Sequence, residues 1–401
     1  MGANKYPMRC QFLKHGLAID YNRLLRPCCS FHGDQIWRDQ NQLHQVDLMT
    51  WHSRPQLLKL QQQMSQDIWP TECGVCQDIE SQGRGDSMRL NAESAYAHYQ
   101  EQDITIEIRP GNVCNFACQT CWPEASSRVT DFYRKANIDT TTDWTSGDSN
   151  VIQIAQARHG LDLDRIAAVL PRVRDIIILG GEPFYDPECK RFLAWLVDNH
   201  CEANLLIFTN GSCVDRSMLE HYAGKVTLIF SLDAMGDAAE YIRYGTVWQD
   251  VVDNYRHCRG LENVSTRVNV TVSTYNFHLV GPLLEWLAED WPEVVSFGIA
   301  STVNNTWFMD ESVLPLLSRA WVVDQLQTSW NFLEQANIEH YQKLNAQNAL
   351  SAIIDRLKHM GFDTIKFYRF VEFVKAMDRV KHTDFAKSMP VLADMLGYQL
   401  L

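Results

Sequence analysis

The fold is decided by Ile104-Thr-Ile-Glu-Ile108 and the stretch that follows it directly, Arg109-Pro-Gly-Asn-Val-Cys114-Asn-Phe-Ala-Cys118-Gln-Thr-Cys121-Trp-Pro123. The first five residues are rich in β-branched side chains and predict a buried strand. The glycine, asparagine and prolines after them predict a loop. In βα barrels the loops at strand ends carry the active site, so this cysteine loop (residues 109–123) is the first candidate site.

Short apolar runs separated by helical lengths continue along the middle of the chain. They are β-branched and nearly continuous, which is typical of strands in a parallel βα sheet or barrel. The further runs are Asp175–Leu179, Asn204–Phe208, Lys225–Phe230, Arg267–Val272 and Val294–Ala300.

The spacing of the three cysteines resembles the CxxxCxxC motif of the radical S-adenosylmethionine (SAM) superfamily. That resemblance implies a partial (β/α)6 TIM-type barrel with a catalytic 4Fe–4S cluster on Cys114, Cys118 and Cys121. Three thiolates can ligate three irons of a cubane and leave the fourth open. In the family, SAM chelates that iron and is cleaved reductively to a 5′-deoxyadenosyl radical, which abstracts hydrogen from the substrate. An electron donor such as flavodoxin or ferredoxin is then implied as a partner. The alternative for three close cysteines is zinc, which usually recruits four ligands.

Later strand ends resemble other motifs of the same family. The run from Asp175 ends in Gly180-Gly181-Glu182-Pro183, similar to the motif that receives the SAM amino group. Glycines in such a turn let the backbone approach a ligand closely. The run that ends in Thr209-Asn210 resembles the third strand end of the family, and it is a further candidate for cofactor binding.

The fourth strand end is Leu228-Ile-Phe-Ser231-Leu232-Asp233. By resemblance Ser231 is a candidate for binding the SAM carboxylate, and Arg243 is a second candidate through its guanidinium fork. A surface salt bridge is the alternative for Arg243. We expect Asp233 to orient the site or the substrate, and Asn276 is a weaker candidate.

Five cysteines also lie ahead of the first predicted strand, and four of them are enough to complete a second cubane. Their arrangement resembles the twitch/SPASM auxiliary-cluster segment, although that segment usually follows the barrel. The resemblance implies a second iron–sulfur cluster on Cys10, Cys28, Cys73 and Cys76, with Cys29 as the alternative to Cys28. One tetrahedral zinc ion is the competing interpretation.

Composition limits the partners. The net charge is −13, and residues 101–304 carry 16 basic against 28 acidic side chains, which suits small substrates or a peptide. No Lys/Arg cluster predicts autonomous nucleic-acid binding. Since there is no apolar run of eighteen residues and no signal peptide, we expect no membrane span and a cytoplasmic location. Clustered cysteines in that compartment indicate metal or redox chemistry, not disulfides.

We expect three segments. These are a Cys-rich segment over 1–100 that looks irregular, a radical SAM core over 101–304 and a helical C-terminal extension over 305–401, with helices over Ser329–Leu344 and Tyr368–Val380. The polar insert 140–149 is expected to be a surface loop.

Three functions follow as hypotheses. The first is a radical SAM enzyme, an oxidoreductase or transferase, that modifies a peptide or protein side chain. The second is radical SAM chemistry on a nucleoside, nucleotide or sugar. The third is a non-catalytic metal-binding scaffold that holds zinc.

Overall fold

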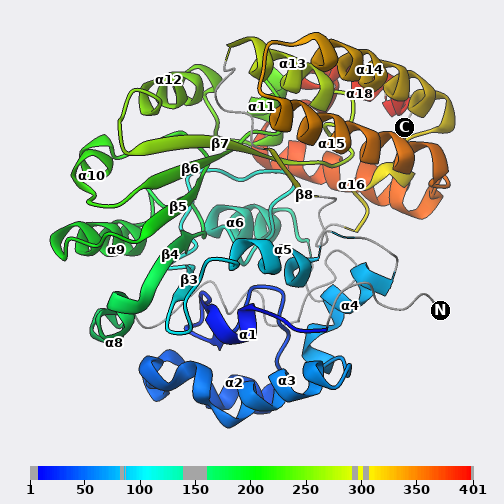
Figure 1. Ribbon diagram of the computed structural model, residues 1–401. Coiled ribbons are helices and arrows are strands. Elements are labelled where there is room, and N and C mark those ends of the chain that lie inside the picture. The colour runs from blue at the N-terminus through cyan, green and yellow to red at the C-terminus, as the bar shows by residue number, and fades with distance from the viewer. Residues whose placement is uncertain are drawn as a thin grey trace.

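The computed structural model describes residues 8–81, 85, 87–138, 160–290, 297–300 and 307–398. The insert 140–149 lies outside them. In the described part, one sheet has the strand order β2-β1-β3-β4-β5-β6-β7-β8 (Figure 1). Every neighbouring pair is parallel except β1 with β2. The strands are β1 (Gly16–Ile19), β2 (Leu25–Arg26), β3 (Ile104–Ile108), β4 (Val173–Ile178), β5 (Asn204–Thr209), β6 (Val226–Ser231), β7 (Val264–Thr271) and β8 (Phe297–Ala300).

The six strands from β3 to β8 each pair with the next strand along the chain, and helices connect them. This sequential order is that of a βα barrel, and because the strands do not close on themselves in the described residues the fold is a partial TIM-type barrel. The α/β fold class predicted from the apolar runs is confirmed. The connecting helices, which cover one face of the sheet in Figure 1, are α8 (Leu163–Val169), α9 (Pro187–Asp198), α10 (Arg216–His221), α11 (Gly236–Ile242), α12 (Trp248–Cys258) and α13 (Val280–Asp290).

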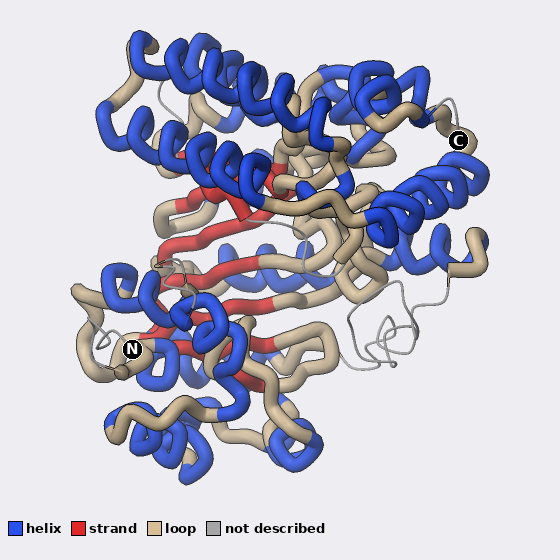
Figure 2. The backbone as a smooth tube through the Cα atoms, turned by 90° about the vertical axis from the view of Figure 1, so that its right-hand side faces the viewer, coloured by secondary structure: helices blue, strands red, loops and turns tan. Residues whose placement is uncertain are grey.

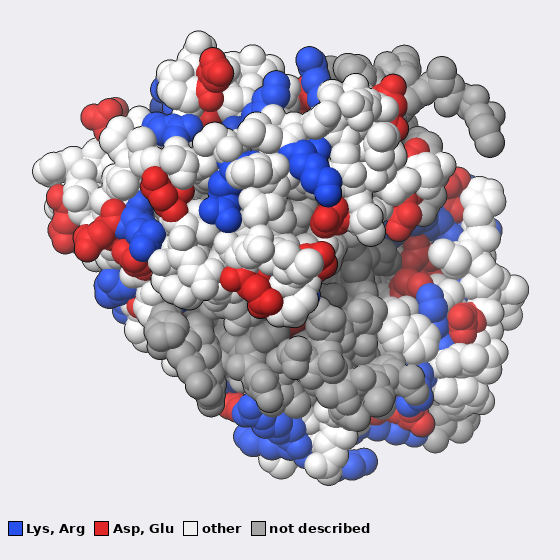
Figure 3. All heavy atoms as spheres, turned by 90° about the horizontal axis from the view of Figure 1, so that it is seen from below, with Lys and Arg blue, Asp and Glu red and all other residues white. Residues whose placement is uncertain are grey.

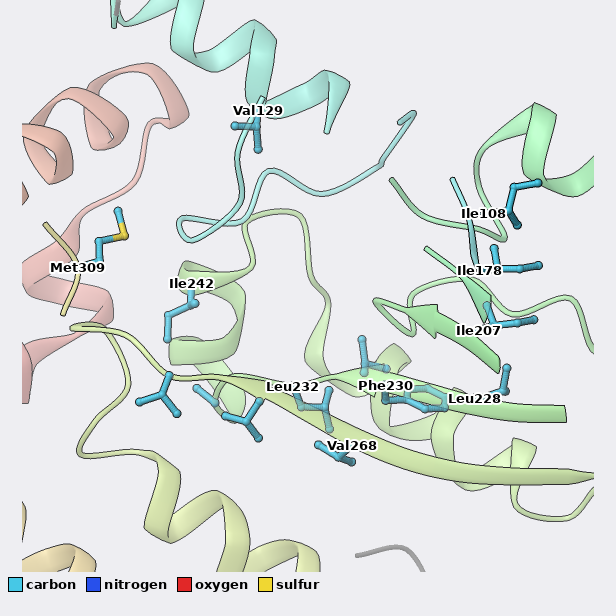
Figure 4. Packing of buried hydrophobic residues seen from close by; sticks show 14 of the residues in the cluster. Ile108, Val129, Ile178, Ile207, Leu228, Phe230, Leu232, Ile242, Val268 and Met309 are labelled. Atoms are coloured by element: carbon cyan, nitrogen blue, oxygen red, sulfur yellow. The ribbon is translucent and has the colours of Figure 1, made fainter. Parts of the chain in front are cut away.

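The core lies between the sheet and those helices. Ile108, Ile178, Ile207 and Leu228 stand opposite one another on four successive strands and are fully buried (Figure 4). Because strand side chains alternate between faces, the residues between them point to the other side of the sheet. This second face, which bears Ser231, forms the inner wall of the partial barrel.

The first hundred residues are more regular than the sequence suggested. Strand β1 pairs in parallel with β3, with Gly16 opposite Thr105 and Ile19 opposite Ile108, so this segment extends the same sheet. The prediction of an irregular segment was therefore wrong. The sequence did not reveal β1 because the strand has only four residues, all buried, and includes Gly and Ala, which are weak strand formers. The helices here are α1 (Phe12–His15), α2 (Gln35–Gln40), α3 (Pro55–Ser65), α4 (Gly74–Ser81) and α5 (Met88–Ala95), with the short 3₁₀ helices η1 (Leu43–Gln45), η2 (Leu48–Ser53) and η3 (Thr71–Cys73).

The C-terminal extension is helical, as predicted, and Figure 2 shows its long helices packed side by side beyond the β8 edge of the sheet. The expected helix over Ser329–Leu344 is wrong, because a break at residues 336–339 separates two helices and a capping box of Glu339 and Gln342 starts the second. The remaining elements are α6 (Ser127–Lys135), η4 (Leu170–Arg172), η5 (Glu311–Val313), α14 (Leu316–Gln335), α15 (His340–His359), α16 (Thr364–Lys381), α17 (Phe385–Ser388) and α18 (Pro390–Met395).

Two surface properties complete the description. Among the described helices, none is both long and apolar enough to cross a membrane. On the face seen from below, basic and acidic side chains lie interspersed over the described part of the surface (Figure 3). Charges of both signs mixed in this way produce little net field over that face.

Candidate functional site

The three cysteines of the cysteine loop lie together beyond the end of β3. Burial and then the charge of Cys118 raise the pKa of the Cys114 thiol to about 12. Burial is also the main reason that the pKa of Cys121 is raised, followed by the charges of Cys118 and Cys114. The sequence spacing thus brings all three partly buried thiols into one group, which can act as a common ligand set.

The loop is held by the chain at the end of α11. The Ala117 amide donates to Tyr244 O at 2.8 Å, and the Gln119 amide donates to Ile242 O at 2.7 Å. These bonds lie on either side of Cys118. They supply the backbone partners that an irregular buried segment cannot find within itself.

The turn after β4 packs directly onto the same loop. The Gly181 amide donates to Gly111 O at 3.2 Å, and the Glu182 amide donates to Val113 O at 3.0 Å. A Cβ at Gly181 would lie 2.2 Å from Val113 O, so only glycine allows this approach. Gly180 has φ of +147°, a conformation that side chains disfavour. The Gly-Gly-Glu-Pro sequence is therefore required by contact with the cysteine loop.

The carboxylate of Glu182 points into the protein. The residue is fully buried, and its carboxylate accepts from Thr209 Oγ1 at 2.8 Å, from the Asn210 amide at 2.6 Å and from the Phe184 amide at 3.2 Å. Burial raises the pKa of Glu182 to about 7, against the lowering effect of these donors. In this arrangement Glu182 ties the ends of β4 and β5 together, and Pro183 is buried in the turn between them.

Candidate residues from the third and fourth strand ends meet at one small cavity. It is lined by Asn210, Ser231 and Arg243, together with Trp248, which the sequence analysis did not identify. Arg243 Nη1 lies 2.9 Å from Asp233 Oδ2, and the two side chains are 13% and 0% exposed. This ion pair is therefore buried and is not the surface salt bridge considered as the alternative.

The Arg243 guanidinium is the main positive charge beside the thiols. Burial lowers its pKa, but the charges of Cys118 and Asp233 outweigh burial and raise the pKa overall. Asp233 is held in turn by the Thr271 amide at 2.8 Å. Asp233 therefore orients Arg243, whereas the fully buried Asn276 donates to the carbonyls of Asp233 and Thr271 and stabilises the backbone.

A polar network beside Cys114 was missed by the sequence analysis. Asn210 Nδ2 donates to Asn115 Oδ1 at 2.9 Å and lies 4.0 Å from Cys114 Sγ. Asn115 Nδ2 donates to Ser212 Oγ at 2.8 Å. Because these side chains come from two loops far apart in the sequence, no local pattern could have joined them. Lys381, at the end of α16, also reaches the cysteine loop and was not foreseen.

The structure also brings together the four cysteines predicted as ligands of a second site. Cys10 precedes α1, Cys28 follows β2, Cys73 ends η3 and Cys76 lies in α4. Burial and then the charges of Cys10 and Cys76 raise the pKa of Cys73 to about 12. Burial, Cys29 and then Cys10 raise the pKa of Cys28. These four thiols therefore influence one another at short range.

Cys29 faces another environment. After burial, the charges of Glu107 and Arg109 have the largest effects on its pKa, which is raised to about 12. Glu107, on β3, and Arg109, in the cysteine loop, form an ion pair at 2.9 Å. Between the two adjacent cysteines, Cys28 is thus the one that shares the surroundings of Cys10 and Cys73.

The donor set of the cysteine loop fits an iron–sulfur cubane. Within the described residues, no group of three or more His, Cys, Asp or Glu side chains is arranged to hold a single metal ion. Around one zinc ion, bonds of about 2.3 Å keep the sulfurs about 3.8 Å apart. The ligands of a cubane do not converge on one ion, since each thiolate binds a different iron and the cysteine sulfurs stand further apart. Three partly buried thiols beside the largely buried cations Arg243 and Lys381 suit an anionic cluster.

The other cysteines are structural. Cys189, Cys201 and Cys258 are buried among apolar side chains, and Cys213 is partly buried. All twelve cysteines of the chain are free thiols. Small buried hydrophobes of this kind contribute packing and no reactivity.

A cavity of about 1310 Å³ opens at the edge of the sheet where the strands begin. Its walls include Thr105, Asp175, Leu206 and Thr227, which lie on the inner face of the partial barrel. Four carboxylates and two basic side chains also line it, namely Asp175, Glu202, Glu220 and Glu262 with Lys225 and Arg267.

Comparisons with known proteins found similarity to solved structures at low sequence identity. No family model matches the chain, and no curated protein matches it. It is similar to Streptococcus suis SuiB bound to S-adenosylmethionine, at 14% identity and a TM-score of 0.35, over 74% of this chain and 63% of that one. For SuiB bound to its precursor peptide SuiA the values are 15%, 0.37, 71% and 58%.

A further similar structure is TYW1 with a lysine–pyruvate adduct bound, at 14% identity and a TM-score of 0.36, over 71% of this chain and 90% of that one. The chain thus spans less than two thirds of the SuiB chains that it matches. At these identities the likeness concerns the course of the backbone alone.

Proposed function

We propose that the chain is a radical SAM enzyme. The observation that carries this proposal is the junction of two motifs: the turn Gly180–Glu182 is bonded through its backbone to the loop that gathers Cys114, Cys118 and Cys121. A scaffold that held zinc would need the cysteines, but it would not need a glycine pair that admits the backbone of residues 111–113 at such close range.

A 4Fe–4S cluster on the three thiols would supply the electron that cleaves SAM to a 5′-deoxyadenosyl radical, which abstracts hydrogen from the substrate. The residues of this chain would bind and orient the cofactor around that centre. Arg243, fixed by Asp233, offers two further N–H groups of its guanidinium to a carboxylate, and Ser231 lines the same cavity. Asn210 and Asn115 present polar side chains beside Cys114. A flavodoxin or ferredoxin would supply the electron from outside.

We further propose that Cys10, Cys28, Cys73 and Cys76 hold a second iron–sulfur cluster. The support is their mutual proximity and the buried cation Arg89, which pairs with Glu80 and lies beside Cys10 and Cys76. With four thiolates this cluster would be closed, which suits electron transfer or a structural role. One zinc ion remains the competing occupant of these four thiols.

The substrate that we propose is a peptide or protein side chain. The support is the charge of the middle of the chain, where residues 101–304 carry 16 basic against 28 acidic side chains. This excess of negative charge opposes a polyphosphate group, which weighs against nucleotides. A nucleoside or a sugar is the alternative substrate.

The test of the central proposal is chemical. Protein reconstituted without oxygen should contain iron and sulfide, and with dithionite and SAM it should release 5′-deoxyadenosine. Cys118→Ala should abolish this product, whereas Cys258→Ala, which removes a buried thiol from α12, should not. Zinc in place of iron, or unchanged product from Cys118→Ala, would refute the proposal.

Metal counts test the second cluster in the same preparation. Two cubanes give about eight irons per chain, and Cys73→Ala combined with Cys76→Ala should lower that number to about four. About four irons with one zinc in the unsubstituted protein would assign zinc to the N-terminal thiols. Cys28→Ser and Cys29→Ser decide between the adjacent cysteines, because only the first should reduce the metal content.

Stimulation of SAM cleavage tests the substrate class. Extract from the source cells is separated by size, and each fraction is added to the reconstituted protein while 5′-deoxyadenosine is measured. Stimulation by a fraction that loses its effect after protease treatment would support a peptide or protein substrate. Stimulation by a small-molecule fraction that resists protease would instead favour the nucleoside or sugar alternative.

A further inference from the structure

The last residue of α16 reaches into the cysteine loop from the C-terminal extension. Lys381 is 4% exposed, and its ammonium donates to Ala117 O at 2.8 Å and to Gln119 Oε1 at 3.0 Å. These two partners flank Cys118, from which Lys381 is separated by more than 260 residues of chain. A segment expected only to extend the fold therefore contributes directly to the candidate site.

Its position is fixed by more than these hydrogen bonds. The Lys381 ammonium lies over the rings of Tyr244 and Phe132, at 5.4 Å and 5.7 Å from their centres. The Tyr244 hydroxyl donates to Lys381 O at 3.0 Å. Tyr244 also accepts the Ala117 amide, so the lysine, the aromatic ring and the loop form one connected unit.

The ammonium has no carboxylate of its own in the part of the chain that the structure describes, where no acidic oxygen lies within ion-pair distance of it. Asp378 is the carboxylate whose charge acts on Lys381, and its oxygens already accept from the Tyr241 hydroxyl, the Thr383 hydroxyl and the Phe385 amide. A buried charge that lacks an opposite charge is costly. The thiols of Cys118 and Cys121 are the other acidic groups that act on Lys381.

We propose that Lys381 is a positioning residue whose ammonium is the counter-charge of an iron–sulfur cluster on the cysteine loop. This inference rests on the proposed function. It makes the C-terminal extension part of the active site, because the extension supplies both the cation and the bonds that fix the loop around Cys118.

The charge has a measurable consequence beyond holding the loop. Reduction adds one negative charge to the cluster, so a nearby cation stabilises the reduced state more than the oxidised state. A unit charge acting over roughly ten ångströms of protein changes such an equilibrium about tenfold. For a one-electron couple, tenfold corresponds to about 59 mV. Loss of the Lys381 charge should therefore lower the midpoint potential by about that amount.

Three substitutions separate charge from shape. Lys381→Gln keeps a hydrogen-bond donor for Ala117 O without the charge, Lys381→Met keeps only the length of the side chain, and Lys381→Arg keeps the charge. Lys375→Met, an exposed position on the same helix, is the matched control. Each protein is reconstituted, its iron and sulfide are measured, and its midpoint potential is determined by a redox titration followed by electron paramagnetic resonance. Urea unfolding of the metal-free proteins shows whether each variant folds.

We expect Lys381→Gln and Lys381→Met to lower the midpoint potential by about 59 mV, a tenfold change in the equilibrium constant for reduction, or to lose iron. Lys381→Arg and Lys375→Met should keep a potential and an iron content near those of the unsubstituted protein. A potential and iron content in Lys381→Gln equal to those of the unsubstituted protein would overturn the inference. Equal loss of iron in all three Lys381 variants would also overturn it, since charge would then have no part. If the unsubstituted protein takes up no iron, the proposed function itself fails.

Discussion

Gly181→Ala tests whether the turn after β4 determines the position of the cysteine loop. A Cβ at this position would lie 2.2 Å from Val113 O and 2.5 Å from Val113 C. Ordinary contact begins at 3.4 Å, so the two backbones would have to separate by roughly 3.4 − 2.2 = 1.2 Å. Neither atom belongs to a flexible side chain, and the strain cannot be relieved by a rotamer change.

The cost of that separation can be estimated from its parts. Overpacking of this kind costs about 1–3 kcal/mol. The shift also breaks the bonds from the Gly181 and Glu182 amides to the loop, each worth about 1 kcal/mol. We therefore expect the free energy of unfolding of the metal-free protein to fall by about 3–5 kcal/mol. Iron uptake by the reconstituted protein should fall as well, because the thiols are carried by the displaced loop.

Urea unfolding followed by tryptophan fluorescence measures the first effect, and iron content measures the second. Gly361→Ala is the control, since a Cβ there meets no atom within 4 Å and the change should be smaller than about 1 kcal/mol. If Gly181→Ala unfolds at the same urea concentration as the unsubstituted protein and takes up the same amount of iron, the loop is not positioned by this turn and the reasoning is wrong.

Three other changes have directions that follow from burial. Burial lowers the pKa of His278 to about 4, so the folded state stays neutral while the unfolded state takes up a proton below about pH 6.5. Between pH 7 and pH 5 this group should lower the free energy of unfolding by about 2 kcal/mol, and the change that urea unfolding measures over that range should differ by that amount in His278→Gln. Glu182→Gln places an amide NH₂ group at a carboxylate that accepts from three donors. We expect it to lower the free energy of unfolding by about 1–3 kcal/mol, measured by urea unfolding at pH 7. Asp233→Asn leaves Arg243 buried without its charged partner and should lower the free energy of unfolding by about 3 kcal/mol. Adding Arg243→Met should restore most of this loss, which a double-mutant cycle measures.

The sheet could be predicted because its central strands are long and apolar on both sides. The bounds of two strands, Val226–Ser231 and Asn204–Thr209, differ from the predicted runs by at most one residue at each end. Strand β1 could not be predicted, since its four residues gain their stability from pairing with Ile104–Ile108, almost ninety positions later. The break at residues 336–339 escaped notice because apolar spacing continues across it.

The candidate site also has a part that the sequence predicted and a part that it did not. The motifs that end strands were found, because each is local and the strands bring their ends to one edge. Their contacts were not found. Glu182 was assigned to the cofactor through the resemblance of its motif, and the bonds that its carboxylate accepts from Thr209 and Asn210 were not foreseen. Trp248 and Lys381 had no signal at all, because a residue that completes a site from a distant helix follows no sequence pattern.

The buried cysteine loop has no regular structure, and every polar backbone group in it needs a partner from elsewhere. Ala117 N and Gln119 N find theirs at the end of α11, while Ala117 O receives the ammonium of Lys381. The shape that gathers the three thiols is therefore imposed largely by segments distant in the sequence, from the turn at Gly181 to Lys381, and is not a property of the motif. It follows that a chain ending at residue 304 would keep every cysteine and glycine of the motifs, but it would leave a buried carbonyl beside Cys118 without its donor.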